Sequence, residues 1–113
     1  MYPLSKQENF VTNLDKLSAV SPDAATGFRA FRRVIEEHGP LDDKQRELCL
    51  LAGFAATRNE PGFRVHVNRA NAAGASIREI EQVALFMLGT SLGLVPVVEA
   101  LDWIHDELGT QED

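Results

Sequence analysis

The sequence predicts an all-α protein of about six helices, and three observations lead to this prediction. Apolar residues recur at spacings of three and four along most of the chain, as they do on one face of a helix. Residues typical of helix starts and stops separate these segments. No segment shows the sustained alternation of apolar and polar residues that marks a half-buried strand. With 113 residues, of which 44% are hydrophobic and 25% charged, the chain is expected to form a single domain over residues 1–113.

Two helices are expected in the first third of the chain, over residues 6–19 and about 22–38. Ser21 followed by Pro22 is a typical start signal, because the serine hydroxyl can cap the first turn and proline fits there. Gly39–Pro40 stops the second helix. The apolar stripe of the first helix contains Phe10, Val11, Leu14 and Leu17. The predicted buried face of the second helix contains Phe28, Phe31, Val34 and Ile35.

Residues 41–76 predict two further helices, joined at residues 58–61. Pro61 at a first helical position and Gly74 just past the last turn bracket the second of them. The two apolar stripes contain Leu48, Leu51, Ala52 and Ala55 in one helix and Phe63, Val67, Ala70 and Ala73 in the other. The unusual polar residues against these stripes are Glu47, at the edge of the first, and His66, inside the second.

The last two helices are expected over residues 77–88 and 96–108. Ser76 and Glu79 form the capping-box pattern that opens the fifth helix. This helix is apolar on more than one side, which predicts a subunit interface in a homo-oligomer. Its apolar residues are Ile77, Ile80, Val83, Ala84, Leu85, Phe86, Met87 and Leu88. The inward residues of the sixth helix are expected to be Val97, Leu101, Ile104 and Leu108.

Charge and composition exclude several classes of function. The net charge of −6 argues against nucleic acid, and Arg29, Arg32 and Arg33 are expected to lie on a solvated helix face. No apolar run approaches the length of a membrane span and the N-terminus has no secretory signal, so we expect a cytoplasmic protein without a membrane partner. The single cysteine, Cys49, cannot form an intrachain disulfide and is expected to be a small buried hydrophobic residue.

Four short motifs follow one another in the second half of the chain. They are Lys44-Gln45-Arg46-Glu47-Leu48, His66-Val67-Asn68-Arg69-Ala70, Gly74-Ala75-Ser76 and Glu79-Ile80. In this order they resemble the carboxymuconolactone decarboxylase family, which also contains the alkyl hydroperoxide reductase D-like thiol proteins. The resemblance extends from about Gly39 to about Leu108. It implies the all-α alkyl hydroperoxide reductase D-like fold and assembly into trimers or hexamers.

One departure from the family pattern decides between its branches. The peroxidase members carry a Cys-x-x-Cys pair that ends four residues before the histidine, and here these positions are Asn59 and Gly62. Dithiol chemistry needs an attacking thiolate and a resolving thiol, and neither is present at this site. The decarboxylase branch, which lacks the pair, remains open. A thiol peroxidase would instead need Cys49 to be exposed and activated, which its apolar sequence neighbours argue against.

His66 and Glu47 are the candidate catalytic residues. A histidine in an apolar stripe is often a core or interface residue, whereas the resemblance implies a general acid or base at His66. Glu47 is either a surface carboxylate in an ion pair or a residue that orients His66 and couples to its proton. If Thr57 and Pro61 are level at the turn, Glu47 and His66 are offset by about 8 Å along the helices. Direct contact is therefore not expected without a bridging water, a kink or a neighbouring subunit.

The resemblance implies a cofactor-free lyase that removes carbon dioxide from an anionic lactone in the degradation of aromatic compounds. This chemistry needs a cation to hold a carboxylate, for which Arg46, Arg64 and Arg69 are the candidates. It also needs an apolar wall and an acid, proposed as His66. The three histidines are not spaced as metal ligands, so no metal is expected. The alternative is a non-enzymatic oligomeric protein that binds a small molecule on the same scaffold.

Overall fold

The computed structural model describes residues 6–110, with side chains described from Asn13 onwards. Within this range it contains six α-helices and no strand, which confirms the predicted fold class. The helices are α1 (Lys6–Val20), α2 (Pro22–Glu36), α3 (Asp43–Ala56), α4 (Glu60–Ala72), α5 (Ile77–Phe86) and α6 (Leu94–Leu108). Phe10 and Val11, predicted for the stripe of α1, lie outside the residues whose side chains are described.

Helix caps fix most of the predicted boundaries. Ser21 caps α2 through its side-chain oxygen, and Ser76 and Glu79 form the predicted capping box at the start of α5. In that box the two reciprocal hydrogen bonds have lengths of 2.8 and 3.1 Å. Three boundaries differ by two residues from the prediction, because α2 ends at Glu36, α5 ends at Phe86 and α6 begins at Leu94.

The turn between α3 and α4 is shorter than the sequence suggests. Arg58 adopts the left-handed conformation with a φ of 58°, which ends α3 in the way a glycine often does. The backbone N–H of Asn59 donates to the carbonyl of Phe54 at 2.9 Å, and that of Arg58 to the carbonyl of Ala55 at 3.1 Å. These two bonds form a Schellman motif. Asn59 then caps α4 by accepting a hydrogen bond from the N–H of Gly62, so α4 begins at once.

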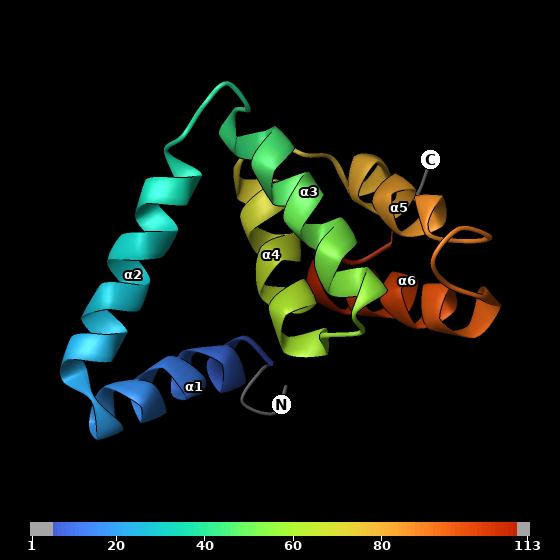
Figure 1. Ribbon diagram of the computed structural model, residues 1–113. Helices are drawn as coiled ribbons and strands as arrows, with labels where there is room; N and C mark the ends of the chain where they lie inside the picture. The colour runs from blue at the N-terminus through green and yellow to red at the C-terminus, as the bar shows by residue number, and fades with distance from the viewer. Residues whose placement is uncertain (1–5, 111–113) are drawn as a thin grey trace.

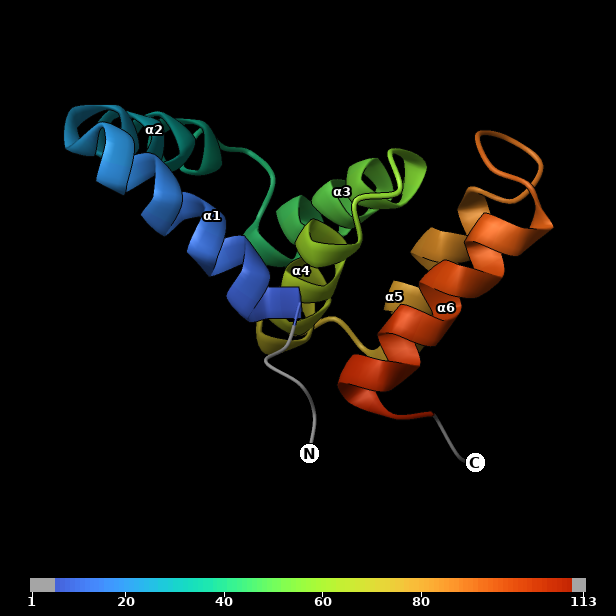
Figure 2. The same ribbon diagram turned by 90° about the horizontal axis from the view of Figure 1, so that it is seen from below.

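Helix α4 lies at the centre of the molecule. It packs against α1, α3, α5 and α6, and Figures 1 and 2 show these helices on its different sides. The predicted stripes of α3 and α4 supply much of the core, since Leu51, Ala55, Phe63, Val67 and Ala70 are all buried. Ile80, Val83, Ala84, Val97, Ala100 and Ile104 complete it from α5 and α6.

Helix α2 departs most from the sequence prediction. Of the described helices it packs closely only against α1, and in Figure 1 it stands apart from the α3–α4 hairpin. The predicted buried face is exposed: Phe31 is 61% and Val34 70% accessible, and Phe28 and Ile35 are close to half exposed. The prediction was wrong because the apolar face points away from the protein's own core. We call Phe31, Val34 and Ile35 the arm face.

A second apolar surface is found on α5 and α6. Leu85 and Phe86 are 50% and 61% exposed, in agreement with the expectation that α5 has more apolar surface than one core can bury. Together with the exposed Leu94, Val95 and Val98 of α6, they form what we call the α5–α6 face. None of the helices in the described part of the chain has the length and apolar character needed to cross a lipid bilayer.

Candidate functional site

Glu47 and His66 are in direct contact. Oε1 of Glu47 lies 2.6 Å from Nδ1 of His66, and the two residues are 1% and 5% exposed. An ionised carboxylate only accepts hydrogen bonds, so the Nδ1–H group of His66 donates and its Nε2 is left for another partner. No hydrogen bond to Nε2 occurs among the described residues.

The expectation that these residues are too far apart was wrong, and the register of the hairpin explains why. The ring of Phe54 packs directly over Gly62, since a Cβ atom at Gly62 would lie 2.6 Å from it. If Phe54 and Gly62 are level, Glu47 lies seven residues before one and His66 four residues after the other. The offset is then three residues, about 4.5 Å, which two long side chains can bridge. The tight turn at Arg58 produces this register.

Glu47 is held from its other side as well. Nη2 of Arg46 lies 3.2 Å from Oε2 of Glu47, and Nη1 of Arg46 lies 2.9 Å from Oδ1 of Asp43. Burial by itself raises the pKa of Glu47, but the hydrogen bond and charge of His66, the hydrogen bond of Arg46 and the charge of Arg69 outweigh it. The pKa of Glu47 is therefore below its usual value, and the carboxylate is ionised near neutral pH.

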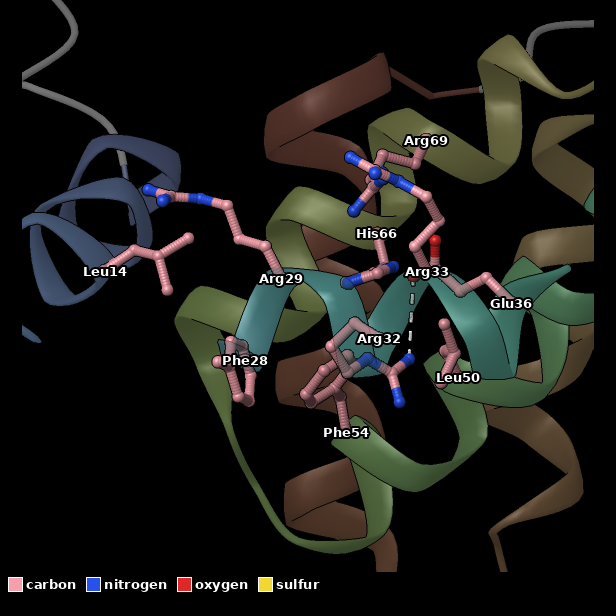
Figure 3. A pocket seen from close by; sticks show the side chains of 10 residues that line it. All are labelled: Leu14, Phe28, Arg29, Arg32, Arg33, Glu36, Leu50, Phe54, His66 and Arg69. Atoms are coloured by element: carbon pink, nitrogen blue, oxygen red, sulfur yellow. Dashed lines mark ion pairs between the residues drawn. The ribbon is translucent and has the colours of Figure 1, made fainter. Parts of the chain in front are cut away.

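His66 faces a cavity of about 550 Å³ between α2 and the α3–α4 hairpin. Figure 3 shows its imidazole among side chains from three other helices, with Arg69 and Arg33 on one side and Phe54 on the other. The rings of Phe54 and His66 have their centroids 5.0 Å apart. The cavity is lined by Leu14, Phe28, Arg29, Arg32, Arg33, Glu36, Leu50, Phe54, His66 and Arg69.

The sequence interpretation placed the three arginines of α2 on a solvated face, and Arg29 and Arg33 are indeed exposed. It did not foresee that all three also line the cavity that His66 faces. Arg32 is paired with Glu36 at 3.6 Å, whereas Arg29 and Arg33 form no ion pair among the described residues. Because the apolar face of α2 points outwards, its opposite, arginine-bearing face points towards His66. The sequence signal that could have indicated this site is a helix in which cations outnumber the neighbouring carboxylates.

The three arginines predicted to bind substrate have three different environments. Arg69 lines the cavity, as predicted. Arg46 binds the oxygen of Glu47 that does not contact His66, and it does not line this cavity. Arg64 lies on another face of α4, is 6% exposed and joins α4 to α6 through ion pairs with Asp106 and Glu107 at 2.9 and 3.0 Å. Arg64 thus belongs to a structural network and does not line the cavity of His66, so we do not retain it as a candidate substrate ligand.

Cys49 is exposed rather than buried, which corrects the sequence prediction. The buried residues of α3 are Glu47, Leu51 and Ala55, and Cys49 points about half a turn away from their face. It lines a smaller cavity of about 210 Å³ beside the main one. The other lining residues are Arg32, Ile35, Glu36, His38, Leu41, Arg46 and Leu50.

The two positions that carry cysteines in the thiol peroxidases have structural roles here. Asn59 caps α4, and its side-chain oxygen accepts from the N–H of Gly62 at 3.1 Å. Gly62 gives the ring of Phe54 room to pack against α4, and any side chain there would collide with it. The hairpin is thus built without a thiol pair and uses both positions for packing and capping.

A family model described as the carboxymuconolactone decarboxylase family matches residues 22–105, which is more than half of the chain. The match begins at the first residue of α2 and ends within α6, so it includes the arginine-bearing helix as well as the hairpin. Neither a curated protein nor a solved structure gives a significant match.

Proposed function

The chain belongs to the carboxymuconolactone decarboxylase family, and on this premise we propose that it is a cofactor-free carboxy-lyase. Its substrate would be a small anionic lactone formed in the degradation of aromatic compounds. The observation that carries the proposal is the position of His66, which is bound to Glu47 and faces a cavity lined by Arg29, Arg33 and Arg69. Among the described residues Arg29 and Arg33 form no ion pair, and Arg69 acts on Glu47 only through its charge.

The cavity suits an anionic ligand with an apolar body. Among the described residues Arg29 and Arg33 form no ion pair, which leaves positive charge that a substrate carboxylate would neutralise. Guanidinium groups bind carboxylates through paired hydrogen bonds. Arg33 and Arg69 both line the cavity and project to the same side of His66 in the view of Figure 3, which makes them our candidates for the carboxylate next to the reacting carbon. Phe28, Leu50 and Phe54 provide apolar surface for the ring.

The proposed reaction breaks one carbon–carbon bond. The carboxylate leaves as neutral carbon dioxide, and its bonding electron pair stays on the substrate carbon, where the lactone can delocalise it as a dienolate. The apolar wall favours this step because it solvates a carboxylate poorly and carbon dioxide well. The arginines then stabilise the charge that remains on the substrate.

His66 would complete the reaction by protonating the dienolate carbon. Since Nδ1 is bound to Glu47, the proton would come from Nε2, the nitrogen left for the cavity. Glu47 would stabilise the charged imidazolium and keep the ring oriented, as a buried carboxylate does for a catalytic histidine. Solvent would return the proton to His66 after each turnover, so no cofactor is consumed.

The arm face and the α5–α6 face support a homo-oligomer. Both are apolar and exposed, and they lie towards opposite sides of the molecule in Figure 1. Apolar surfaces of this kind normally mark interaction sites. We propose that copies of the chain cover them, and the resemblance to the family points to a trimer or hexamer.

The test is turnover of carboxymuconolactone, followed as carbon dioxide release. We expect activity in the wild type and a decrease in kcat of about 10²- to 10⁴-fold in His66→Gln, which keeps hydrogen bonding but cannot transfer a proton near neutral pH. Asp102→Asn, which is exposed on α6, lies outside both apolar faces and lines neither cavity, is the control for unspecific effects. Binding of the lactone without turnover by the wild type would instead identify a small-molecule-binding protein.

A further inference from the structure

A chain of charged groups extends from the start of α3 to His66. Asp43 binds Nη1 of Arg46, Nη2 of Arg46 binds Oε2 of Glu47, and Oε1 of Glu47 binds Nδ1 of His66, at 2.9, 3.2 and 2.6 Å. The exposure of the side chains falls along the chain from 80% at Asp43 to 23% at Arg46 and 2% at Glu47. Arg46 therefore connects the surface with a buried carboxylate.

We propose that Arg46 is a positioning residue for His66, acting through Glu47, and that it does not bind substrate. The inference rests on the proposed function of His66. It assigns to Arg46 a task that its residue type alone does not reveal, since a cation near an active site would equally suit a substrate carboxylate.

The geometry around the Glu47 carboxylate supports this role. With one oxygen bound by His66 and the other by Arg46, the carboxylate plane is fixed and Oε1 stays directed at Nδ1. Without Arg46, Oε2 would be a buried anionic oxygen lacking that hydrogen bond, and the carboxylate would turn to find another donor. The ring of His66 would then lose the partner that fixes its tautomer and its direction.

The environment of Arg46 also argues against a direct role in substrate binding. Arg46 is absent from the lining of the His66 cavity and borders the smaller neighbouring cavity. Both of its Nη atoms are already engaged, by Asp43 and Glu47. Its Nε is buried without a hydrogen-bond partner among the described residues, which indicates that the two Nη contacts determine how the guanidinium is placed.

Kinetics of carboxymuconolactone turnover separate the two roles. In Arg46→Met we expect kcat to fall about 10- to 100-fold with little change in KM, because the acid is misplaced while the substrate contacts remain. Arg46→Lys, which can reach only one of the two carboxylates, should lose less. Asp43→Asn, at the exposed end of the chain, should lose at most about 5-fold. Lys44→Met is the matched control, because it removes a cation from the same turn that pairs with Glu79 instead.

The pH profile adds a readout that a purely structural role would not move. His66 is surrounded by charged groups from three helices: Glu47, Arg69, Arg29, Arg32, Arg33 and Glu36. If Arg46 positions the pair, Arg46→Met turns the Glu47 carboxylate away from the imidazolium, so the alkaline limb of kcat/KM should move to lower pH; an Arg46 that acts only through its positive charge would move it to higher pH instead. Glu47→Gln should move the same limb to lower pH, because the partner of the imidazolium is lost.

A third measurement does not depend on the substrate. In the wild type, the Nδ1 proton of His66 should give a downfield NMR signal from its short hydrogen bond to Glu47, and this signal should weaken in Arg46→Met and persist in Lys44→Met. An increase in KM with unchanged kcat, or an unchanged proton signal and pH profile in the folded Arg46 variants, would overturn the proposal. If His66→Gln is fully active, the proposed function fails, while the NMR measurement still reports whether Arg46 orients the pair.

Discussion

The α3–α4 hairpin and helix α2 differ in whether their apolar side chains face the core of the molecule. In the hairpin, the apolar stripes are buried and the polar pair of Glu47 and His66 is buried with them. In α2, Phe31 and Val34 face outwards, whereas the arginines and Phe28 line the cavity. The difference shows that an amphipathic pattern identifies a face that needs cover, but not whether the same chain or another copy provides it.

The largest effect should come from disrupting the arm face. Phe31→Asp places a charge at the centre of the exposed apolar stripe of α2, so we expect the oligomer to dissociate while each chain stays folded. Thr26→Asp, also exposed on α2 but outside the arm face, is the control. Sedimentation at micromolar concentration should show an oligomer for the wild type and the control. A wild type that sediments only at 12.5 kDa would contradict the assignment of the arm face as an interface.

Within the hairpin, Glu47→Gln should lower the free energy of unfolding by about 3 kcal/mol near neutral pH, because charge-assisted hydrogen bonds to His66 and Arg46 are lost. The pKa of Glu47 is below its usual value in the folded protein, so its contribution is present above the unfolded-state pKa of about 4.3. It is lost as the pH falls through the lower folded-state pKa. Urea unfolding should therefore show a difference between wild type and variant at about pH 5 that shrinks towards about pH 3.

Glycine substitutions compare a tightly packed position in the hairpin with two positions that have free space, one in α2 and one in α3. Gly62→Ala should lower the free energy of unfolding by about 1–2 kcal/mol, since the new Cβ atom would lie 2.6 Å from Phe54, which also contacts His66. Gly27→Ala in α2 and Gly53→Ala in α3 meet no atom within 4 Å and should raise it by about 0.5–1 kcal/mol. If thermal or urea unfolding shows the same change in unfolding free energy at all three positions, Gly62 is not packed more tightly than Gly27 and Gly53.

The smallest effect is expected at Cys49. Because its side chain is exposed, Cys49→Ala leaves no core cavity and should change the free energy of unfolding by less than about 0.5 kcal/mol. Lyase activity should remain within a few-fold of the wild type. Hydroperoxide turnover that disappears in this variant would instead show that the exposed thiol is a catalytic group.

The sequence predicted the number and order of the helices well, because caps and breakers such as Ser21, Ser76 and Gly74 act locally. It also identified Glu47 and His66, which are polar residues beside or within apolar stripes. Their direct contact could not be predicted, because it depends on the left-handed turn at Arg58 and the packing of Phe54.

The arginines show a different limit of sequence interpretation. The sequence places Arg46 in α3 and both Arg64 and Arg69 in α4. Which group each arginine contacts depends on the direction in which its side chain leaves the helix: Arg46 meets Glu47, Arg64 meets α6 and Arg69 lines the cavity. Arg29 and Arg33 were assigned to a solvated face because a short cluster of cations on one helix usually lies in solvent. Both are exposed, but they also line the cavity, and the charge pattern alone does not show which element lies opposite them.

The central claim is that α2 supplies binding groups and the hairpin supplies the acid, and initial-rate kinetics on Arg33→Gln test it most directly. The account predicts that KM for carboxymuconolactone rises about 10-fold or more with kcat nearly unchanged, because a charge-assisted contact to the carboxylate is lost. Lys16→Gln, an exposed cation on α1, should leave both constants unchanged. An unchanged KM in Arg33→Gln, with normal folding and assembly, would contradict the placement of the arginine face of α2 in the site.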